Sequence, residues 1–454
     1  MNVEPNEIKC IPKEETMRRL LSVAVVVMVG VIGVVLSSGV VFGDSSGKGD
    51  LKIQTSLNVP NPPKGITFSV GPDEALTYPS SAADLPDEHT TFIPRFHGLD
   101  GYLVFGASRV TGVETGAGVV VLETQDLQTF TFATGYTSPV MSPPLPFTSC
   151  KSPITYDPEF DLNYAAPGSV VRDPTRPFGN LIMIYEAENH CPGGQWQQPY
   201  YATVGFARSS DNGRTWPEPV DNEFGGPSRY PILKGPEDES PVPIPVADQK
   251  PLGNAIPSAF VDGNYLYVTY VFAGPGADGL IRVARGELGG SDPLNFFKWY
   301  KPSSSEPGAF SESGIGGLDS GVLPPGGCTG RQDMSQISYN DVLDVYMMTF
   351  VCVSLQDNPP QAAWFFSTAT SLDAQDWTPP QVIENSQFPV TEACGSGGSG
   401  DAFDGWYPSF VSPGFKSGHL SGWGQVFFMN GCDTGSRTFM SRRFEITGPP
   451  LIWP

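Results

Sequence analysis

One pattern of short apolar segments returns five times along the sequence, at intervals of about eighty residues. Each unit opens with a segment that often contains Pro-Ser or a close variant. The five openings are TFIPRF (91–96), AAPGSVV (165–171), NAIPSAFV (254–261), DMSQISY (333–339) and GWYPSFV (405–411). Two more apolar segments follow in every unit, separated by Gly, Asp, Asn and Pro. The alternating and β-branched residues of these segments predict strands, and the separators predict turns.

The units also share an ending in which Ser or Thr and an aspartate precede an aromatic residue. The aspartates are Asp126, Asp211, Asp292 and Asp373, which lie 85, 81 and 81 residues apart. A fixed period with several short strands per unit is typical of a β-propeller. One unit cannot bury both of its faces alone, so neighbouring units must stack around an axis. We therefore expect residues 66–454 to be all-β and to form a five-bladed β-propeller of four-stranded antiparallel blades.

Composition narrows the alternatives. The 52 glycines and 46 prolines among 454 residues exclude a helical bundle or a coiled coil, because both residue types disfavour helix interiors. Hydrophobic residues make up 39% of the chain and aromatic residues 11%, which is enough for a packed core. The formal net charge of −22 repels a phosphate backbone, so we expect no nucleic-acid partner.

The N-terminal part predicts export. Residues 20–42 carry no charge and are long enough to span a bilayer as a helix. Arg18 and Arg19 precede this segment, so residues 1–19 are expected in the cytoplasm and the main domain outside. Two interpretations remain open, an uncleaved signal anchor at the cell surface and a cleaved signal peptide with secretion. Residues 43–65 are polar and Pro-rich, as is typical of a linker.

Six cysteines follow the apolar segment and are expected in an oxidising compartment. An even number of this size allows up to three disulfides, whose pairing the sequence leaves open. No C-x-x-C pair occurs, which disfavours a structural zinc site. The six are Cys150, Cys191, Cys328, Cys352, Cys394 and Cys432.

The segment SSDNGRTW (209–216) resembles the sialidase-type Asp-box at each defining position. The resemblance implies scaffold roles, in which Asp211 caps a turn and Trp216 packs between blades. The five units and their openings are similar to the five-bladed glycoside hydrolase superfamily, which includes arabinanases, xylosidases, invertases and levansucrases. This resemblance covers most of residues 85–450 and implies a carbohydrate substrate, with three carboxylates at the inner ends of early blades. Gly168 and Asn254 stand where it implies acids.

In a propeller, residues just before each opening strand line one mouth of the central funnel. Hydrolysis of a glycosidic bond there needs one carboxyl group as proton donor and another as base or nucleophile. The predicted catalytic residues are Asp404, Asp333 and Asp161, followed by Glu186 from the acidic segment IYEAENHC. Aromatic rings that could stack on a sugar, and polar groups that could bind its hydroxyls, are the predicted substrate-binding residues. They are Arg331, Asn254, Asn163, His89, Trp406, Tyr407 and Glu188.

Three interpretations of this mouth remain open. The first is a glycosidase, and the second is a propeller that binds a glycan or a protein partner without catalysis. The third is a structural surface protein, which predicts a funnel plugged by apolar side chains. The sequence predicts no cofactor: the acidic funnel could hold a structural Ca²⁺, but no calcium-loop pattern is present.

Overall fold

The computed structural model describes the chain from residue 65 to residue 449 with gaps. The described ranges are 65–83, 85–95, 101–110, 118–143, 160–161, 164–189, 201–216, 221–222, 226–227, 229–235, 252–273, 277–290, 294–354, 361–389, 404–414, 416–431 and 437–449. The chain divides into two compact units, Met1–Asn58 and Val59–Pro454, and the described residues belong to the second. The predictions for residues 1–19, 20–42 and 43–64 lie outside the described residues. Within the described ranges, no helix has the length and apolar character needed to cross a bilayer.

The described strands form five antiparallel groups, which we call blades 1 to 5 in chain order from residue 91. Blade 1 contains β3 (Thr91–Pro94), β4 (Tyr102–Val110), β5 (Gly118–Thr124) and β6 (Thr131–Phe132). Blade 2 contains β7 (Tyr164–Arg172), β8 (Leu181–Asn189), β9 (Tyr201–Ser209) and β12 (Arg229–Leu233). Blade 3 contains β13 (Leu252–Asp262), β14 (Tyr265–Ala273), β15 (Ile281–Glu287), β16 (Phe296–Tyr300) and β17 (Ala309–Ser313).

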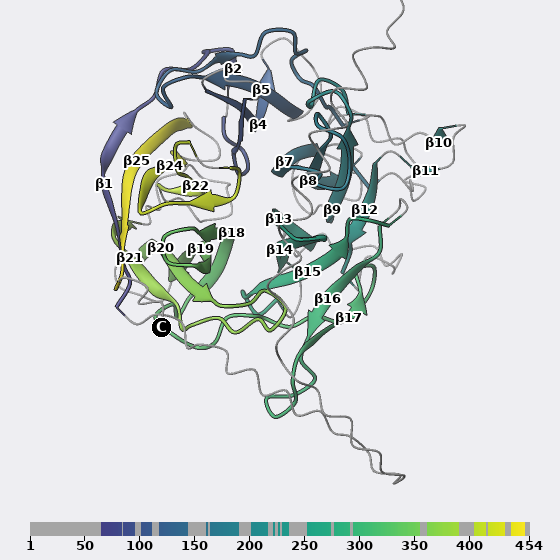
Figure 1. Cartoon of the computed structure of the whole chain (residues 1–454), viewed down its shortest axis with the longest axis vertical. Helices are drawn as coiled ribbons and strands as arrows, with labels where there is room; N and C mark the ends of the chain where they lie inside the picture. The colour runs from purple at the N-terminus through teal and green to yellow at the C-terminus, as the bar shows by residue number, and fades with distance from the viewer. Residues whose placement is uncertain are drawn as a thin grey trace, which may run out of the picture. The chain divides into compact units, whose positions relative to one another are not determined.

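Blade 4 contains β18 (Arg331–Asn340), β19 (Val345–Ser354), β20 (Gln361–Ala369) and β21 (Gln381–Pro389). Blade 5 contains β22 (Trp406–Val411), β24 (Trp423–Asn430), β25 (Thr438–Thr447) and the first strand of the domain, β1 (Thr67–Ala75). Short pairs complete the set: β2 (Ala82–Ala83) pairs with β4, β23 (His419–Leu420) with β18, and β10 (Asp221–Asn222) with β11 (Gly226–Pro227). Figure 1 shows the blades following one another around a centre. The all-β, propeller-like prediction is confirmed.

The N-terminal strand closes the ring. β1 runs antiparallel to β25 and supplies the outermost strand of blade 5, although its partners are nearly the last described residues of the chain. β1 also touches β21 of blade 4 through one parallel pair, Ser69 and Glu384. Parallel pairing between the described strands occurs only where neighbouring blades meet. The pairs are β1 with β21, β9 with β13 and β18 with β23.

The innermost strands carry a repeated irregularity. The register shifts within the first residues of β7, β13, β18 and β22. In three of them the bulged residue has a positive φ without being glycine: Ile256 (51°), Met334 (50°) and Tyr407 (52°). Such bulges bend a strand and re-aim its side chains. Three adjacent blades therefore turn equivalent residues in the same way beside the axis.

A polar side chain of the repeated opening joins most of the inner strands to their neighbours. The backbone N–H of an inner strand donates to a side-chain oxygen of the preceding blade at four of the five junctions. These bonds are Val170 N to Thr91 Oγ1 (3.1 Å), Ala259 N to Ser169 Oγ (2.9 Å), Phe410 N to Gln336 Oε1 (2.9 Å) and Thr90 N to Ser409 Oγ (3.0 Å). An alternating polar position on an inner strand thus satisfies a neighbouring backbone group that would otherwise be buried unpaired.

The Ser209–Trp216 segment forms a capped turn. Asp211 accepts hydrogen bonds from the backbone N–H of Thr215 (3.0 Å) and from the Ser209 hydroxyl (2.8 Å). Gly213 has a φ of 81°, and Trp216 is buried, with its ring edge-on to Phe105 of blade 1 at 6.3 Å. Asp211 and Trp216 are therefore scaffold residues.

Asp126 caps the equivalent turn of blade 1 through the N–H groups of Gln128 and Thr129. Blade 4 departs from the predicted spacing. There Asp376 accepts from the N–H groups of Thr370 and Ser371, while Asp373 pairs with Arg285. Asp292 lies outside the described residues.

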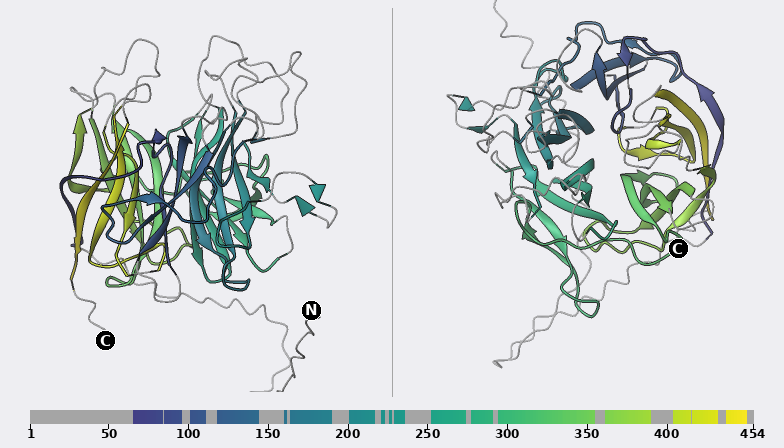
Figure 2. Two further views of the ribbon diagram at one scale, coloured as in Figure 1. Left: turned by 90° about the horizontal axis from the view of Figure 1, so that it is seen from above. Right: turned by 180° about the vertical axis from the view of Figure 1, so that it is seen from behind.

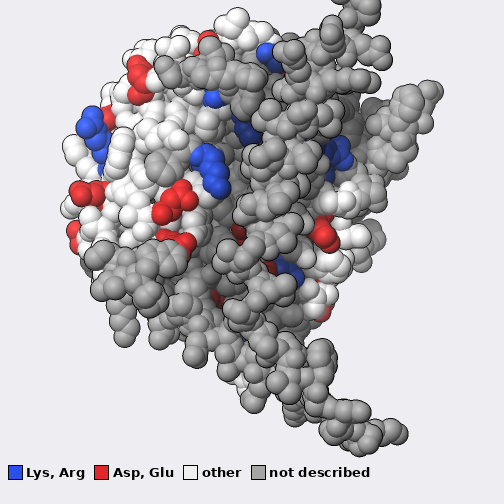
Figure 3. Space-filling view, viewed as in Figure 1, with Lys and Arg blue, Asp and Glu red and all other residues white. Residues whose placement is uncertain are grey.

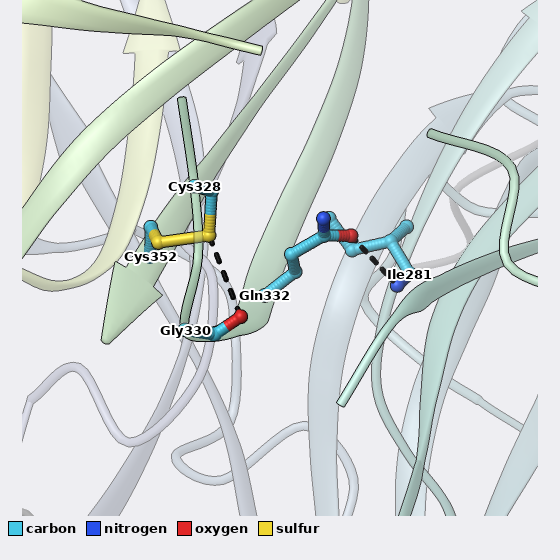
Figure 4. The surroundings of a disulfide bond; sticks show 5 residues. All are labelled: Ile281, Cys328, Gly330, Gln332 and Cys352. Carbon is cyan, nitrogen blue, oxygen red and sulfur yellow. Dashed lines mark hydrogen bonds between the residues drawn. A yellow bond between two sulfur atoms is a disulfide. The ribbon is translucent and has the colours of Figure 1, made fainter. Parts of the chain in front are cut away.

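A disulfide joins Cys328, in the connection between blades 3 and 4, to Cys352 of β19 (Figure 4). The Cys328 sulfur also lies 3.6 Å from the carbonyl oxygen of Gly330, and the Gln332 side-chain oxygen accepts from the N–H of Ile281 in blade 3. The connection is thereby held against both blades. One predicted disulfide is confirmed; the other four cysteines lie outside the described residues.

The turns between the first and second strands of the blades lie at one end of the propeller, which we call the hairpin end. Figure 2 shows the strands side-on, running between the two ends. Contacts between these turns link successive blades around the ring. They are Arg172 Nη2 to Pro94 O (2.8 Å), Thr175 Oγ1 to Leu288 O (3.4 Å), Tyr346 Oη to Asp262 Oδ2 (2.8 Å), the rings of Tyr339 and His419 (5.5 Å) and Gly414 N to Tyr102 Oη (2.9 Å). The inner strands begin at the opposite end, the mouth end.

Candidate functional site

Three glutamates from two blades meet near the mouth end. Glu88 precedes β3 of blade 1, and Glu186 and Glu188 lie near the end of β8 in blade 2. Two residues apart on a strand, Glu186 and Glu188 point to the same face. The exposed fractions are 2% for Glu88, 3% for Glu186 and 7% for Glu188. We call these three residues the carboxyl trio.

The carboxyl groups of the trio act on one another. Beyond the effect of burial, the charge of Glu186 raises the pKa of Glu88, and the charge of Glu188 raises the pKa of Glu186. The backbone N–H of Ile256, the bulged residue of blade 3, donates to Glu186. Neighbouring carboxyl groups that are buried together cannot all be ionised, because like charges repel strongly in a buried site. The arrangement therefore holds one or more protons between the carboxyl groups.

The pKa values follow from burial and mutual repulsion. Burial raises the pKa of Glu88 well above its usual range, and the charges of Glu186, Asp87 and Glu188 raise it further. Burial and the charge of Glu188 likewise raise the pKa of Glu186, whereas the hydrogen bond from Ile256 opposes this effect. Glu88 and Glu186 are therefore the members that retain protons as pH rises.

Neutral polar groups surround the trio. Burial lowers the pKa of His89 to about 4, so its imidazole is neutral at physiological pH. The His89 ring meets Tyr407 edge-on at 6.1 Å. Tyr164, paired with Glu188 across β7 and β8, donates its hydroxyl to the carbonyl oxygen of Asp87 (2.9 Å). Arg437 forms an ion pair with Asp87, the residue before Glu88.

Asn254 opens the inner strand of blade 3, two residues before Ile256. Its side chain is fully buried, and neither its amide nitrogen nor its amide oxygen has a hydrogen-bond partner among the described residues. The Oε2 atom of Glu88 and both ring nitrogens of His89 share this property. Buried polar atoms of this kind are normally paired. These atoms can therefore bind hydroxyl groups.

Apolar side chains from the other blades complete the surroundings. Met334 of blade 4 is fully buried in a core cluster against which Ile256 and Tyr407 pack. The backbone N–H of Tyr407 lies 3.3 Å from the Met334 sulfur. Blades 3 to 5 thus contribute a mainly apolar wall, and blades 1 and 2 contribute the carboxyl groups. The axial region therefore combines a polar and an apolar side.

The predicted aspartates have other contacts. Asp404 is exposed, and its Oδ1 accepts from the N–H of Gly431 (3.0 Å). Asp161 is fully buried, accepting from the Tyr185 hydroxyl (3.1 Å) and pairing with Arg229 of β12 at 3.4 Å. The contact with an outermost strand puts Asp161 inside blade 2 rather than at the mouth. Asp404 therefore caps a turn, and Asp161 belongs to a buried ion pair.

Asp333 lies at the bulge of β18, where its Oδ1 accepts from the N–H of Met334 (3.0 Å). Arg331 is 44% exposed, and its Nε atom is 3.2 Å from Asp333 Oδ2. Trp406 and Tyr407 are half-buried at the equivalent position of β22, with ring centroids 5.9 Å apart. The structure therefore brings Glu186, Glu188, His89, Tyr407 and Asn254 to one region. Asn163 lies outside the described residues.

Glu88 is not among the catalytic residues predicted from the sequence, although it directly precedes the predicted binding residue His89. Its partner Glu186 is distant in the sequence, so no local pattern links them. The alternation Glu-Ala-Glu at the end of an apolar strand was the available signal, since it puts two acids on one strand face. Among the described residues, no group of three or more His, Cys, Asp or Glu side chains has an arrangement suited to a metal ion.

Charge on the visible surface is mixed. Figure 3 shows acidic and basic side chains interspersed over the described part of this face, without a broad basic area.

Comparison with solved structures finds propeller enzymes. The catalytic domain of a GH62 α-L-arabinofuranosidase from Coprinopsis cinerea is 12% identical, with a TM-score of 0.44, and covers 85% of this chain and 98% of its own. A Podospora anserina α-L-arabinofuranosidase in complex with cellotriose is 8% identical, with a TM-score of 0.46 and coverages of 86% and 99%. An N-acetylgalactosamine deacetylase from F. plautii is 13% identical, with a TM-score of 0.44 and coverages of 84% and 95%.

The solved structures that resemble this chain thus include glycoside hydrolases of the five-bladed propeller type, as the sequence led us to expect. At these identities and scores the similarity carries no argument about the reaction. No protein-family model matches the chain, and no curated protein matches it. The function must therefore be argued from the site.

Proposed function

We propose that this protein is an exported carbohydrate-active enzyme, a glycoside hydrolase that works by carboxylate acid/base chemistry near the mouth end of its propeller. The observation that supports the proposal best is the carboxyl trio, in which three buried acids from two blades raise one another's pKa values. Glycoside hydrolysis requires one protonated and one ionised carboxyl group on either side of the scissile bond. A trio that retains protons near neutral pH supplies both forms at once.

The raised pKa values divide the roles. Glu88 and Glu186 are the members with raised pKa values, so in this proposal they carry the protons and Glu188 is the carboxylate. Glu88 gives its proton to the leaving glycosidic oxygen, because the two reacting carboxyl groups must flank the scissile bond and Glu88 comes from a different blade than Glu188. The ionised carboxylate stabilises positive charge at the sugar carbon and accepts the proton of the incoming water. The net reaction adds one water across the glycosidic bond and returns the trio to its initial protonation.

Neighbouring groups fit a sugar ligand. The half-buried rings of Trp406 and Tyr407 can stack on a sugar face, and the Asn254 amide can bind hydroxyl groups. Arg331, largely exposed beside Asp333, can bind a hydroxyl or a sugar carboxylate. Export agrees with the uncharged segment 20–42 and the arginines before it.

A propeller that binds glycan without cleaving it is the second candidate. It is favoured by Asn254 at a position where the resemblance implies an acid, and by the structural contacts of Asp161 and Asp404. In this second interpretation the trio would be a binding surface for hydroxyl groups. The buried Met334 and half-buried Ile256 also agree with it, because they narrow the axial region with apolar side chains.

The test is a turnover screen of the full chain on aryl-glycosides and polysaccharides. Glu88→Gln, Glu186→Gln and Glu188→Gln each keep the side-chain shape and remove the titrating group. We expect a loss of turnover of about a hundredfold or more in at least one of them. The exposed Glu445→Gln on β25 is the matched control and should retain full turnover.

Asp404→Asn and Asp333→Asn separate this site from the one expected from the sequence. Turnover that survives all three glutamine substitutions but collapses in either asparagine variant would show that the catalytic residues lie outside the trio. Saturable glycan binding without turnover of any substrate would contradict the hydrolase and leave the binding protein.

A further inference from the structure

Exposed apolar side chains gather at the hairpin end of the propeller. Trp423 is 61% exposed, Val342 56% and Phe178 48%. Phe178 lies in the turn between β7 and β8, Val342 in the turn between β18 and β19, and Trp423 at the start of β24, just after the connection from β22. Three blades thus each present one large apolar residue where their first two strands are joined.

Two of the remaining exposed apolar residues, Phe297 and Ile315, lie toward the same end. Phe297 pairs with Ser313, the last residue of β17, near the end of β15 that adjoins the β13–β14 turn. Ile315 and Leu318 follow β17, and Val382 is the second residue of β21. Five of the seven large apolar side chains that are exposed among the described residues therefore lie toward the hairpin end: Phe178, Phe297, Ile315, Val342 and Trp423. Val382 lies at mid-strand in blade 4, opposite Phe365. A biased distribution of this kind marks an interaction surface.

The chain enters the propeller at this end. Thr67 at the start of β1 pairs with Thr447, and Trp423 pairs with Glu445 two residues earlier on β25. The polar segment 43–65 and the uncharged segment 20–42 precede β1. For comparison, a flexible chain of the same length has a root-mean-square span of roughly 25–30 Å. If segment 20–42 lies in a bilayer, the tether keeps the hairpin end close to the membrane surface.

We propose that the hairpin end docks on a neutral lipid bilayer, with Phe178, Val342 and Trp423 inserted at the interface and the mouth end directed away from it. Tryptophan favours the interface because its ring is apolar while its N–H remains hydrated. A tether raises the local concentration of a docking surface to the order of millimolar, so weak insertion suffices to orient the domain. The proposal is independent of the reaction at the trio.

Charge at the hairpin end favours neutral lipid. The Arg172 guanidinium lies 4.5 Å over the Phe178 ring, which places a cation beside one inserted residue. Three carboxylates at this end are engaged by neighbours: Asp262 by Tyr346, Asp344 by Tyr339 and Asp341 by His419. A chain with a net charge of −22 is repelled by an anionic surface. Phosphatidylcholine-like headgroups carry no such penalty.

Bromine quenching of tryptophan tests the proposal. The full chain is reconstituted into phosphatidylcholine bilayers with brominated acyl chains and into the same bilayers without bromine. Bromine quenches only tryptophans that reach the acyl region, and segment 20–42 contains none of the 8 tryptophans. We expect a loss of emission on the order of one eighth, and we expect Trp423→Phe to abolish it.

Two further variants sharpen the result. Val342→Asp puts a charge at a second inserted tip and should reduce the quenching of Trp423, because the tips insert together. Trp406→Phe, at the mouth end, should leave the quenched fraction unchanged. Equal quenching in the wild type and in Trp423→Phe, or no quenching in the wild type, would overturn the proposal. Both results are read without any substrate, so they are separate from a failure of the hydrolase proposal.

Discussion

Replacement of Glu88 by glutamine should make the protein more stable at neutral pH. In the folded chain, burial and the charges of Glu186, Asp87 and Glu188 raise the pKa of Glu88 well above the value of about 4.5 for an unperturbed group. Below that value Glu88 is protonated in both the folded and the unfolded chain. Above it the unfolded chain loses the proton while the folded chain keeps it, so stability falls with rising pH. Glutamine has no proton to lose and avoids this fall.

The size of the effect follows from the linkage relation. Each pH unit in which only the unfolded Glu88 is ionised lowers the free energy of unfolding by about 1.4 kcal/mol. A unit that spans Val59–Pro454 has an unfolding entropy on the order of 0.8 kcal/mol per kelvin. The Tm of Glu88→Gln should therefore gain on the wild type by about 2 °C per pH unit above pH 4.5, until the raised pKa of Glu88 is reached.

The assay is thermal unfolding of the full chain at pH 4, 5, 6 and 7, conditions chosen to bracket the unperturbed glutamate pKa of about 4.5. Wild type and Glu88→Gln should agree at the lowest pH and diverge above it. Glu445→Gln, at an exposed site on β25, should follow the wild type throughout. Parallel curves for the wild type and Glu88→Gln would refute the reasoning, because they would mean that Glu88 titrates alike in the folded and unfolded chain.

Two scaffold predictions concern positions away from the trio. Gly168→Ala should destabilise the protein by about 1–3 kcal/mol, because the added Cβ would lie 1.9 Å from the carbonyl oxygen of Pro257 in the next blade. Gly289→Ala is the control in the same unfolding assay, because its added Cβ would have no atom within 4 Å. Asp211→Ala and Asp376→Ala should each lower stability by about 1 kcal/mol through the loss of turn-capping bonds, and an unchanged denaturation midpoint in either would contradict the capping role.

The sequence predicted the repeat because blade formation is local. Each opening, second and third strand is encoded by adjacent alternating residues and turn signals, and the inner strands were found where the Pro-Ser openings indicated. The closure of the ring by β1 could not be predicted in this way. Its partners on β25 lie at the other end of the sequence, and the segment TFSVGPDEA has no repeat equivalent to align with.

The site was harder to predict because it depends on contacts between blades. Residues before each inner strand were expected to face the mouth, and Glu88 and Asn254 lie there. Asp161 instead pairs with Arg229 on the outermost strand of blade 2, and Asp404 caps a turn. Glu186 and Glu188 come from a second strand, and only the close packing of blades 1 and 2 brings them to Glu88. Gly168 shows the opposite case, where the backbone of Pro257 leaves no room for the acid that the resemblance implied.

The most direct test of the central claim asks whether the trio holds protons at neutral pH. Infrared difference spectroscopy of the full chain at pH 7 distinguishes the C=O band of a carboxylic acid from the bands of a carboxylate. We predict a carboxylic-acid band in the wild type that is lost or shifted in Glu88→Gln and Glu186→Gln and retained in Glu445→Gln. Identical spectra in that region for the wild type and both trio variants would show ionised carboxylates and contradict the account.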